Sequence, residues 1–373
     1  MSTVEEQQKI IEKTCASYAS LPLVPISQMQ AQSSRDRPAK GRVWISRSSF
    51  PAPPDSGLKD ALFEVIDRLS MPDHIIMAPE ELAQADVGVE FIGTRNGASA
   101  DESEPNVEEP EKLRLLEKET KSDIIILYMH GGALYPADSR AVTTRLAHLT
   151  GAIVASTSYR LCPQHTFPTP ILDVLVAYSS LLYPPTAAAH RLPHKVPATK
   201  IVLAGDSAGA NLALGLLKFL LELNKRPDPT ILFHGQRITL PIPAGIAIAS
   251  GWCDQTDCLP SWLNPNAVDI LTPLQPALWP EYPSDAIWPS DPPREHPYTR
   301  AANLDHELVS PAAVRDWTGA PPMWFAVGEF ERGRDGNTVV ASQATRSGVP
   351  VTWTEWEGMC HEWMIWSAAK TEG

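Results

Sequence analysis

The stretch KIVLAGDSAGANLALGLLKFLLEL, residues 200–223, contains the pattern that decides the fold. Its first five residues have the length and composition of a buried strand, and the part from residue 208 has those of a buried helix. Between them lies Gly205-Asp206-Ser207-Ala208-Gly209. A serine at such a sharp turn is held in strained backbone geometry, and flanking glycines let the strand and the helix approach closely. The pattern predicts a strand, turn and helix that place Ser207 at the carboxyl end of a sheet.

The same alternation of apolar runs and helical patterns continues on both sides of this turn. It predicts an α/β protein with a mostly parallel central sheet flanked by helices, because strands joined by helical crossovers lie parallel. Strand-like runs occur at 123–129, 152–158, 200–205, 244–250, 322–328 and 351–356, and helical patterns near 138–149, 169–182 and 337–346 and from 208 onward.

The rest of the chain divides into segments around this core. Helical patterns at 4–20 and 57–70 are separated by a loose connection at 31–56, and a strand is expected at 89–94. Residues 101–111 hold six acids and no base, which favours a solvated surface loop. The 36 prolines include many within 260–322, which predicts an irregular insertion. The expected division is an N-terminal cap segment 1–88, a first core part 89–252, a Pro/Trp-rich cap insertion 253–321 and a last core part 322–373.

Composition limits the partners of this chain. The 373 residues carry 31 Lys and Arg against 44 Asp and Glu, a net charge of −13, so a nucleic-acid partner is not expected. No apolar stretch is long enough to span a membrane, and the first residues are polar and acidic where a signal peptide is basic and then apolar. The five cysteines are scattered, without the spacing of a zinc site. We expect a soluble cytoplasmic protein with buried, reduced thiols.

A serine nucleophile needs a base, and His361 stands just after the last strand-like run, where the chain order serine, acid, histidine requires it. The acid that orients the histidine must lie between them, after the strand at 322–328. Glu329, Glu331 and Asp335 all meet that condition, and spacing alone does not choose among them.

The developing oxyanion needs preorganised donors. His130-Gly131-Gly132-Ala133 follows the strand at 123–129, and glycines there let backbone N–H groups approach a ligand. The N–H groups of Gly131, Gly132 and Ala208 are therefore the expected oxyanion hole.

Residues 123–366 resemble the α/β-hydrolase fold, and within it the hormone-sensitive-lipase-like esterases, which combine H-G-G-G, G-D-S-A-G and a late G-x-x-H. In that family the acid stands three residues after a strand-ending glycine, which matches Glu331 after Gly328, with Asp335 as the reserve. Ser158-Tyr159-Arg160-Leu161-Cys162-Pro163 and Asp173 are similar to structural positions of the family. Two departures are Ala133 in place of the third glycine and E-R-G-R-D in place of D-P-L-R-D.

The resemblance implies a serine carboxylesterase with Ser207, Glu331 and His361 as its triad, which acts through an acyl-enzyme and needs no metal or organic cofactor. It also implies a cap formed by two segments, the N-terminal residues 1–88 and the insertion 253–321, which follows the sixth strand. Trp252, Trp262, Trp279, Trp288 and Trp317 would line that cap and favour a small to medium apolar or ring-bearing ester; the alternative is that they only pack it onto the sheet. An amidase, deformylase or acyltransferase with the same triad, and a non-catalytic small-ligand receptor on the same fold, are the alternative functions.

Overall fold

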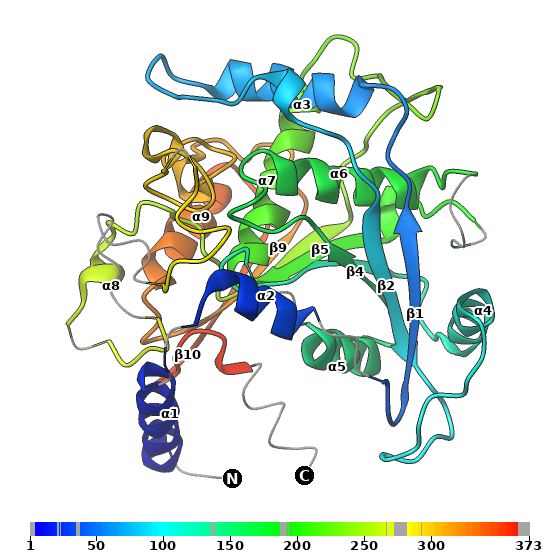
Figure 1. Cartoon of the computed structure of the whole chain (residues 1–373), viewed down its shortest axis with the longest axis horizontal. Coiled ribbons are helices and arrows are strands. Elements are labelled where there is room, and N and C mark those ends of the chain that lie inside the picture. The colour runs from blue at the N-terminus through cyan, green and yellow to red at the C-terminus, as the bar shows by residue number, and fades with distance from the viewer. Residues whose placement is uncertain are drawn as a thin grey trace.

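An eight-stranded sheet forms the centre of the molecule (Figure 1). The computed structural model describes residues 4–20, 22, 24–34, 38–135, 139–186, 192, 194–265, 267–271, 282–291 and 293–364. The strand order is β1-β2-β4-β3-β5-β8-β9-β10. β1 and β2 pair antiparallel, as do β2 and β4, and the other neighbours are parallel. The strands are β1 (Val43–Phe50), β2 (Val87–Thr94), β3 (Ile125–Met129), β4 (Ile153–Ser158), β5 (Ile201–Asp206), β8 (Gly245–Ala249), β9 (Met323–Gly328) and β10 (Val351–Trp356).

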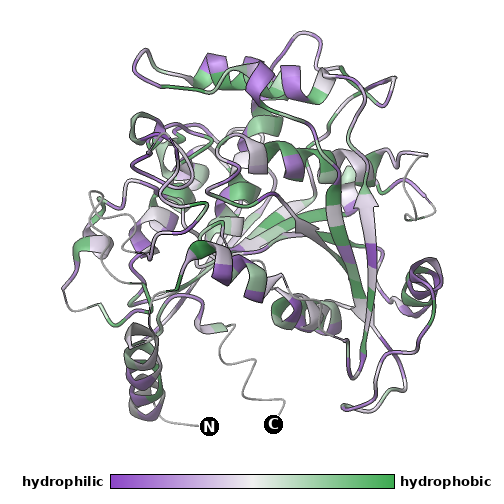
Figure 2. Cartoon of the chain, viewed as in Figure 1, coloured by the Kyte–Doolittle hydropathy of each residue, from purple (hydrophilic) through white to green (hydrophobic). Residues whose placement is uncertain are grey.

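Helices cover both faces of the sheet, as the continuous apolar runs of its central strands require. Alternate residues of β3 show the two faces: Leu127 belongs to the larger apolar cluster with α6 and α7, and Ile126 to a smaller cluster with α5. Figure 2 shows the apolar colour along the central strands and the polar colour on the outer helices. The helices are α1 (Val4–Ala19), α2 (Ile26–Ser33), α3 (Gly57–Leu69), α4 (Glu109–Glu119), α5 (Arg140–Thr150), α6 (Thr169–Leu182), α7 (Ser207–Asn224), α8 (Pro260–Leu263) and α9 (Arg334–Arg346).

The helix α6 is buried along its whole length, because it lies between the sheet and the helices α3 and α7. A helix that is apolar on every side is stable only in such a position. In α7 the polar exceptions, Lys218 and Glu222, are paired at 2.8 Å. The predicted α/β architecture is thus confirmed. The helices α6 and α7, which precede and follow the strand β5 that ends at the Ser207 turn, are both present.

The segment 253–321 follows the sixth strand of this sheet, as predicted, and its described part is mostly irregular. Besides α8 it contains two short 3-10 turns, Ala301–Asn303 and Pro311–Ala313. Asn211 of α7 ties its two ends together, since the Asn211 amide donates to the carbonyl oxygens of Trp252 (3.0 Å) and Val309 (2.7 Å). The insertion is therefore anchored one helical turn from Ser207.

The prediction of a loose connection at 31–56 is wrong, because Val43–Phe50 forms the edge strand β1. The sheet therefore begins inside the segment 1–88 that was expected to be cap. The acidic segment 101–111 explains the strand: Glu104 accepts the N–H of Ile45 (2.8 Å) and Glu109 that of Arg47 (2.6 Å). These carboxylates satisfy edge N–H groups that would otherwise be open to another strand.

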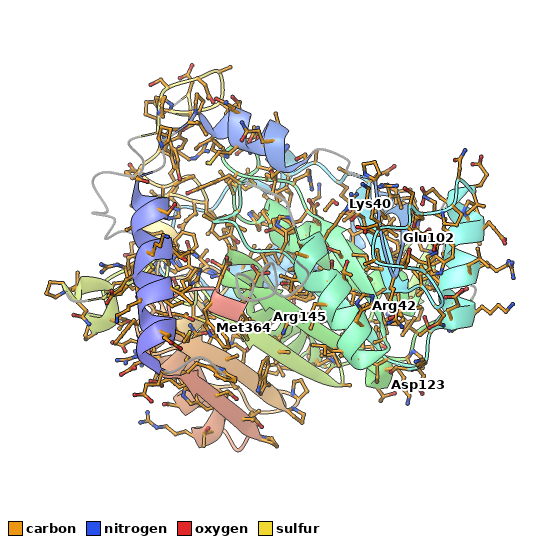
Figure 3. The ribbon with its side chains drawn as sticks, turned by 90° about the horizontal axis from the view of Figure 1, so that it is seen from below. Lys40, Arg42, Glu102, Asp123, Arg145 and Met364 are labelled. Carbon is orange, nitrogen blue, oxygen red and sulfur yellow. The ribbon has the colours of Figure 1, made fainter. Side chains whose placement is uncertain are left out.

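The acidic segment thus supports the sheet edge as well as lying at the surface, and Figure 3 shows Lys40, Arg42 and Glu102 gathered at this end of the molecule, away from Met364. Sequence patterns also missed α2, α4 and a small hairpin of β6 (Ile231–Phe233) and β7 (Gln236–Ile238). Each is short or strongly polar, so its apolar periodicity is weak.

Candidate active site

Ser207 lies at the turn from β5 into α7 with a φ of 47°, in the left-handed region that is unfavourable for a non-glycine residue. The two glycines around it have no room for a side chain. A Cβ on Gly205 would lie 2.6 Å from the carbonyl carbon of Gly209, and a Cβ on Gly209 would lie 2.0 Å from the carbonyl oxygen of Met129. The turn geometry expected from the sequence is therefore present.

His361 and Glu331 meet Ser207 from two other loops. Nε2 of His361 is 2.9 Å from Oγ of Ser207, and Nδ1 is 3.6 Å from Oε2 of Glu331. All three residues are buried. The other oxygen of Glu331 accepts the Ser250 hydroxyl (2.6 Å) and the N–H of Gly328 (2.6 Å), so the carboxylate is held in place.

The two competing acids point elsewhere. Glu329 accepts the N–H of Gly358 at 2.8 Å, and Asp335, in the first turn of α9, accepts the N–H of Ser261 at 2.9 Å. Of the three candidates, the structure brings Glu331 to the histidine.

Burial and charge have opposite effects on the pKa of His361. Desolvation lowers it, but the adjacent carboxylate of Glu331 outweighs burial and raises the pKa of His361. Burial raises the pKa of Glu331, against the effect of the adjacent His361 that lowers it. The pair can thus hold a proton on the imidazole, as a base in acyl transfer must.

The backbone after β3 corrects one expected oxyanion donor. The N–H of Gly131 donates to Oδ2 of Asp206 at 3.0 Å, so it already has a partner and does not point to a free anion site. The next two residues, Gly132 (φ 93°) and Ala133 (φ 51°), adopt left-handed conformations. Ala208 is the second residue of α7, where helical N–H groups have no intrahelical acceptor.

This turn is braced from the neighbouring strand. The ring of Tyr159 stacks on that of His130 with centroids 4.2 Å apart, and its hydroxyl donates to the His130 carbonyl oxygen at 2.6 Å. The next residue, Arg160, makes a bidentate pair with buried Asp173 at 2.7–3.1 Å. These contacts support the structural roles that the resemblance implied.

Glu362 is a residue of the site that the sequence analysis did not use. Its Oε1 is 3.8 Å from Nε2 of His361, the nitrogen that faces Ser207. Its position directly after the candidate base was visible in the sequence, but its direction toward the site depends on a φ of 54° that no sequence pattern reveals.

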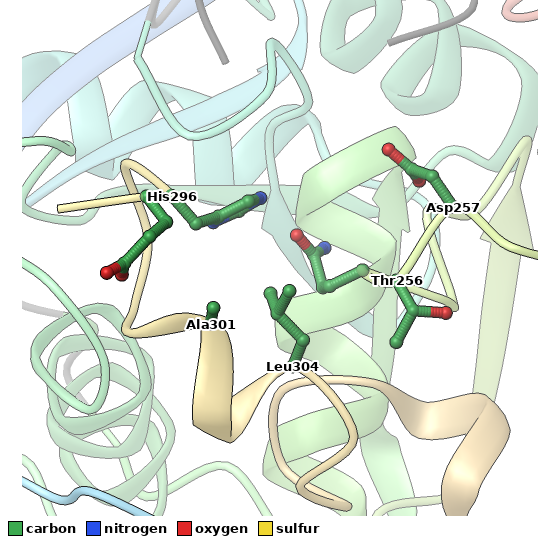
Figure 4. A pocket seen from close by; sticks show the side chains of 7 residues that line it. Thr256, Asp257, His296, Ala301 and Leu304 are labelled. Carbon is green, nitrogen blue, oxygen red and sulfur yellow. The ribbon is translucent and has the colours of Figure 1, made fainter. Parts of the chain in front are cut away.

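A cavity of about 40 Å³ lies within the segment 253–321 (Figure 4). One of its lining residues, Asp257, accepts the indole N–H of Trp252 (3.0 Å), and the backbone N–H of Trp252 donates to the Ser207 carbonyl oxygen (2.9 Å). Burial raises the pKa of Asp257 to about 7. The cavity is lined by Gln255, Thr256, Asp257, Glu295, His296, Ala301 and Leu304.

The tryptophans that were expected to line the cap are core residues. Trp279 lies outside the described residues, and the other four have exposures of 6% or less within the main apolar cluster: Trp252, Trp262, Trp288 and Trp317. They pack the insertion onto the sheet, which was the alternative reading.

The described residues contain neither a metal-binding cluster nor a membrane-spanning helix. Within these ranges, no cluster of three or more His, Cys, Asp or Glu side chains has an arrangement that could hold a metal ion. Over the same part of the chain, no helix has the length and apolar character needed to cross a membrane.

A nucleophile turn, a histidine and a carboxylate at the carboxyl ends of parallel strands define the class of serine-dependent α/β hydrolases. The family model for the alpha/beta hydrolase fold matches residues 126–365, and the chain belongs to this family. It is 30% identical to an acetyl-hydrolase of Streptomyces hygroscopicus over 66% of this chain and 71% of that protein. It is 27% identical to an esterase of Acinetobacter venetianus over 65% and 69%.

A solved hormone-sensitive lipase from a metagenome library has the same fold, with a TM-score of 0.61 at 21% identity over 100% of this chain and 94% of that one. The family and these relatives support a carboxylic ester hydrolase.

Proposed function

We propose that this protein hydrolyses small to medium carboxylic esters through an acyl-enzyme on Ser207. The single observation that carries the proposal is the 2.9 Å contact between Nε2 of His361 and Oγ of Ser207. A serine hydroxyl becomes nucleophilic when a base removes its proton during attack, and this nitrogen is within reach of that proton.

In the proposed reaction, Ser207 Oγ attacks the ester carbonyl carbon while its proton passes to Nε2 of His361. The C–O bond to the alcohol then breaks, and His361 returns the proton to the departing oxygen. Water, deprotonated by the same imidazole, cleaves the acyl-enzyme and restores Ser207. Glu331 orients the ring and stabilises its cationic form.

For the oxyanion we propose the N–H groups of Gly132, Ala133 and Ala208. Gly132 and Ala208 are donors that the sequence also predicted. Ala133 takes the place of Gly131, whose N–H donates to Asp206. The left-handed conformations of Gly132 and Ala133 turn consecutive peptides in one direction, an arrangement that forms an anion-binding concavity.

We propose a short acyl group, such as acetyl. The name of the acetyl-hydrolase relative supports this choice. The earlier preference for apolar or ring-bearing substrates stays a prediction, and the buried tryptophans lend it no support.

The test is turnover of p-nitrophenyl esters with acyl chains from acetate to decanoate, together with labelling by a fluorophosphonate and location of the adduct by peptide mass spectrometry. Ser207→Ala is expected to lose turnover and labelling while keeping its circular dichroism spectrum. Undiminished turnover in this variant would refute the mechanism, and a best rate on decanoate would refute the short acyl group. Added alcohol or hydroxylamine as competing nucleophile separates hydrolysis from acyl transfer in the products.

A further inference from the structure

Glu362 lies beside the reacting atoms in a conformation that its residue type does not favour. Its carboxyl oxygen Oε1 is 3.8 Å from Nε2 of His361, and its N–H donates to the Ser250 hydroxyl at 3.0 Å. Its φ of 54° is in the left-handed region. A non-glycine residue keeps such a conformation where the surroundings over-determine it, and at reaction sites such strain accompanies a positioned side chain.

The carboxyl of Glu362 meets that of Asp206, the residue before the nucleophile. A Cβ on Gly131 would lie 2.1 Å from Oδ2 of Asp206 and 2.8 Å from Oε1 of Glu362, so both oxygens occupy the space over the Gly131 backbone. The two carboxyl groups are close enough to interact directly. Two carboxylates this close repel each other strongly, and one of them keeps a proton.

The Asp206 carboxyl already accepts two hydrogen bonds. The Tyr128 hydroxyl donates to Oδ1 of Asp206, and the N–H of Gly131 donates to Oδ2. Burial, followed by the charge of Asp206, raises the pKa of Glu362 well above its ordinary value, against the charge of His361. The proton therefore lies on Glu362.

We propose that protonated Glu362 is a positioning residue that donates a hydrogen bond to Asp206 and thereby fixes the Gly131 turn and the His361 loop against the nucleophile turn. The titratable groups that face this pair are Tyr128 from β3, Tyr159 from the loop after β4, Glu331 from the loop after β9, and His361 on the same loop as Glu362. Ionisation of Glu362 places two carboxylates together and opens the junction of the three loops. The kinetic part of this proposal rests on the proposed function.

The experiment compares Glu362→Gln, Glu362→Ala and, as a matched control, Glu357→Gln, an exposed residue of the same loop. Its first readout is the pH profile of kcat/KM for p-nitrophenyl acetate. A glutamine donates to Asp206 at every pH, so Glu362→Gln is expected within about threefold of the parent at pH 7, without the alkaline decline of the parent. Glu362→Ala has no donor, and we expect a loss of about tenfold or more because the loops are displaced.

A second readout, the melting temperature against pH, needs no ester turnover. An acid whose pKa is higher in the folded state holds its proton there while the unfolded chain releases it. Stability therefore falls as the pH rises above the unfolded value of about 4.5 and continues to fall up to the folded value. The melting temperature of Glu362→Gln is expected to exceed that of the parent by a margin that widens with pH, whereas Glu357→Gln is expected to follow the parent.

Two results would overturn the proposal: an alkaline decline that persists in Glu362→Gln, or a margin in melting temperature that does not change with pH. If Glu362→Ala does not fold, the glutamine variant alone decides. If the parent has no esterase activity while the melting curves behave as expected, the proposed function fails and the shared proton stands.

Discussion

Single residues shape this site in two ways: glycines leave room for neighbouring groups, and backbone N–H groups are available or already hydrogen-bonded. Gly205 and Gly209 allow β5 and α7 to meet, and Gly131 leaves room for the carboxyl groups of Asp206 and Glu362. Because the N–H of Gly131 donates to Asp206, the proposed oxyanion donors lie one residue further along the chain, at Gly132 and Ala133. An alanine can serve there, since a backbone N–H is the group required and its φ of 51° is tolerated at modest cost.

The raised pKa of His361 predicts an unusual pH dependence. The imidazole must be neutral to act as the base, so kcat/KM for p-nitrophenyl acetate should rise with pH through an apparent pKa above the ordinary 6.5. Glu331→Gln removes the adjacent carboxylate that raises this pKa. The rising limb should then move to lower pH, and kcat should fall about a hundredfold or more.

Asp335→Asn is the control for that variant, because Asp335 bonds to Ser261 and not to the histidine. If Asp335→Asn lost more activity than Glu331→Gln, the assignment of the acid would be wrong.

At the scale of elements, the site depends on how loops and helices are joined to the sheet. The turn after β3 is held by Tyr159, at the end of β4, and the following Arg160 reaches Asp173 inside α6. One contact series thus connects the proposed oxyanion turn, the loop after β4 and a fully buried helix. The insertion after β8 is fixed in a similar way by Asn211 of α7.

The Arg160–Asp173 pair predicts a stability effect. Asp173→Ala leaves the guanidinium of Arg160 without its bidentate partner in a mostly buried position, where the side chain is 18% exposed. Loss of one partner of a buried pair costs about 3 kcal/mol, and we expect a decrease of that size in the free energy of unfolding measured in urea. Asp228→Ala, at an exposed pair with Arg237, should be nearly neutral, and equal effects of the two substitutions would contradict this account.

For the whole molecule, the parts that surround the site come from distant regions of the chain. The N-terminal helix α1 reaches the loop of the candidate base, where Cys15 lies close enough to Cys360 to interact with it. Both thiols are buried, as are Cys162 and Cys253, whereas Cys258 is exposed. The thiols therefore report whether α1 stays in contact with the body of the protein.

Thiol titration tests this arrangement. The protein is first reduced, and the reductant is removed before titration. In the native protein one thiol, Cys258, should then react rapidly with Ellman's reagent, and all five should react after denaturation. Cys258→Ser should abolish the rapid phase. A second rapid thiol that disappears in Cys15→Ser or Cys360→Ser would mean that α1 leaves the His361 loop in solution.

Local sequence patterns predicted the alternation of strands and helices, the nucleophile turn and the candidate base, because apolar periodicity and glycine sterics act over a few neighbouring residues. Spacing left Glu329, Glu331 and Asp335 open and only the family resemblance pointed to Glu331; the tertiary structure brings Glu331 to His361, since all three acids follow one strand and differ in where their side chains point. It also revealed β1, whose polar residues are stabilised by pairing with β2 and by distant carboxylates. The hydrogen bond from the N–H of Gly131 to Asp206 and the proposed proton between Asp206 and Glu362 also could not be predicted from the sequence. Both are contacts between distant segments, which depend on backbone direction and burial, and local patterns do not encode these.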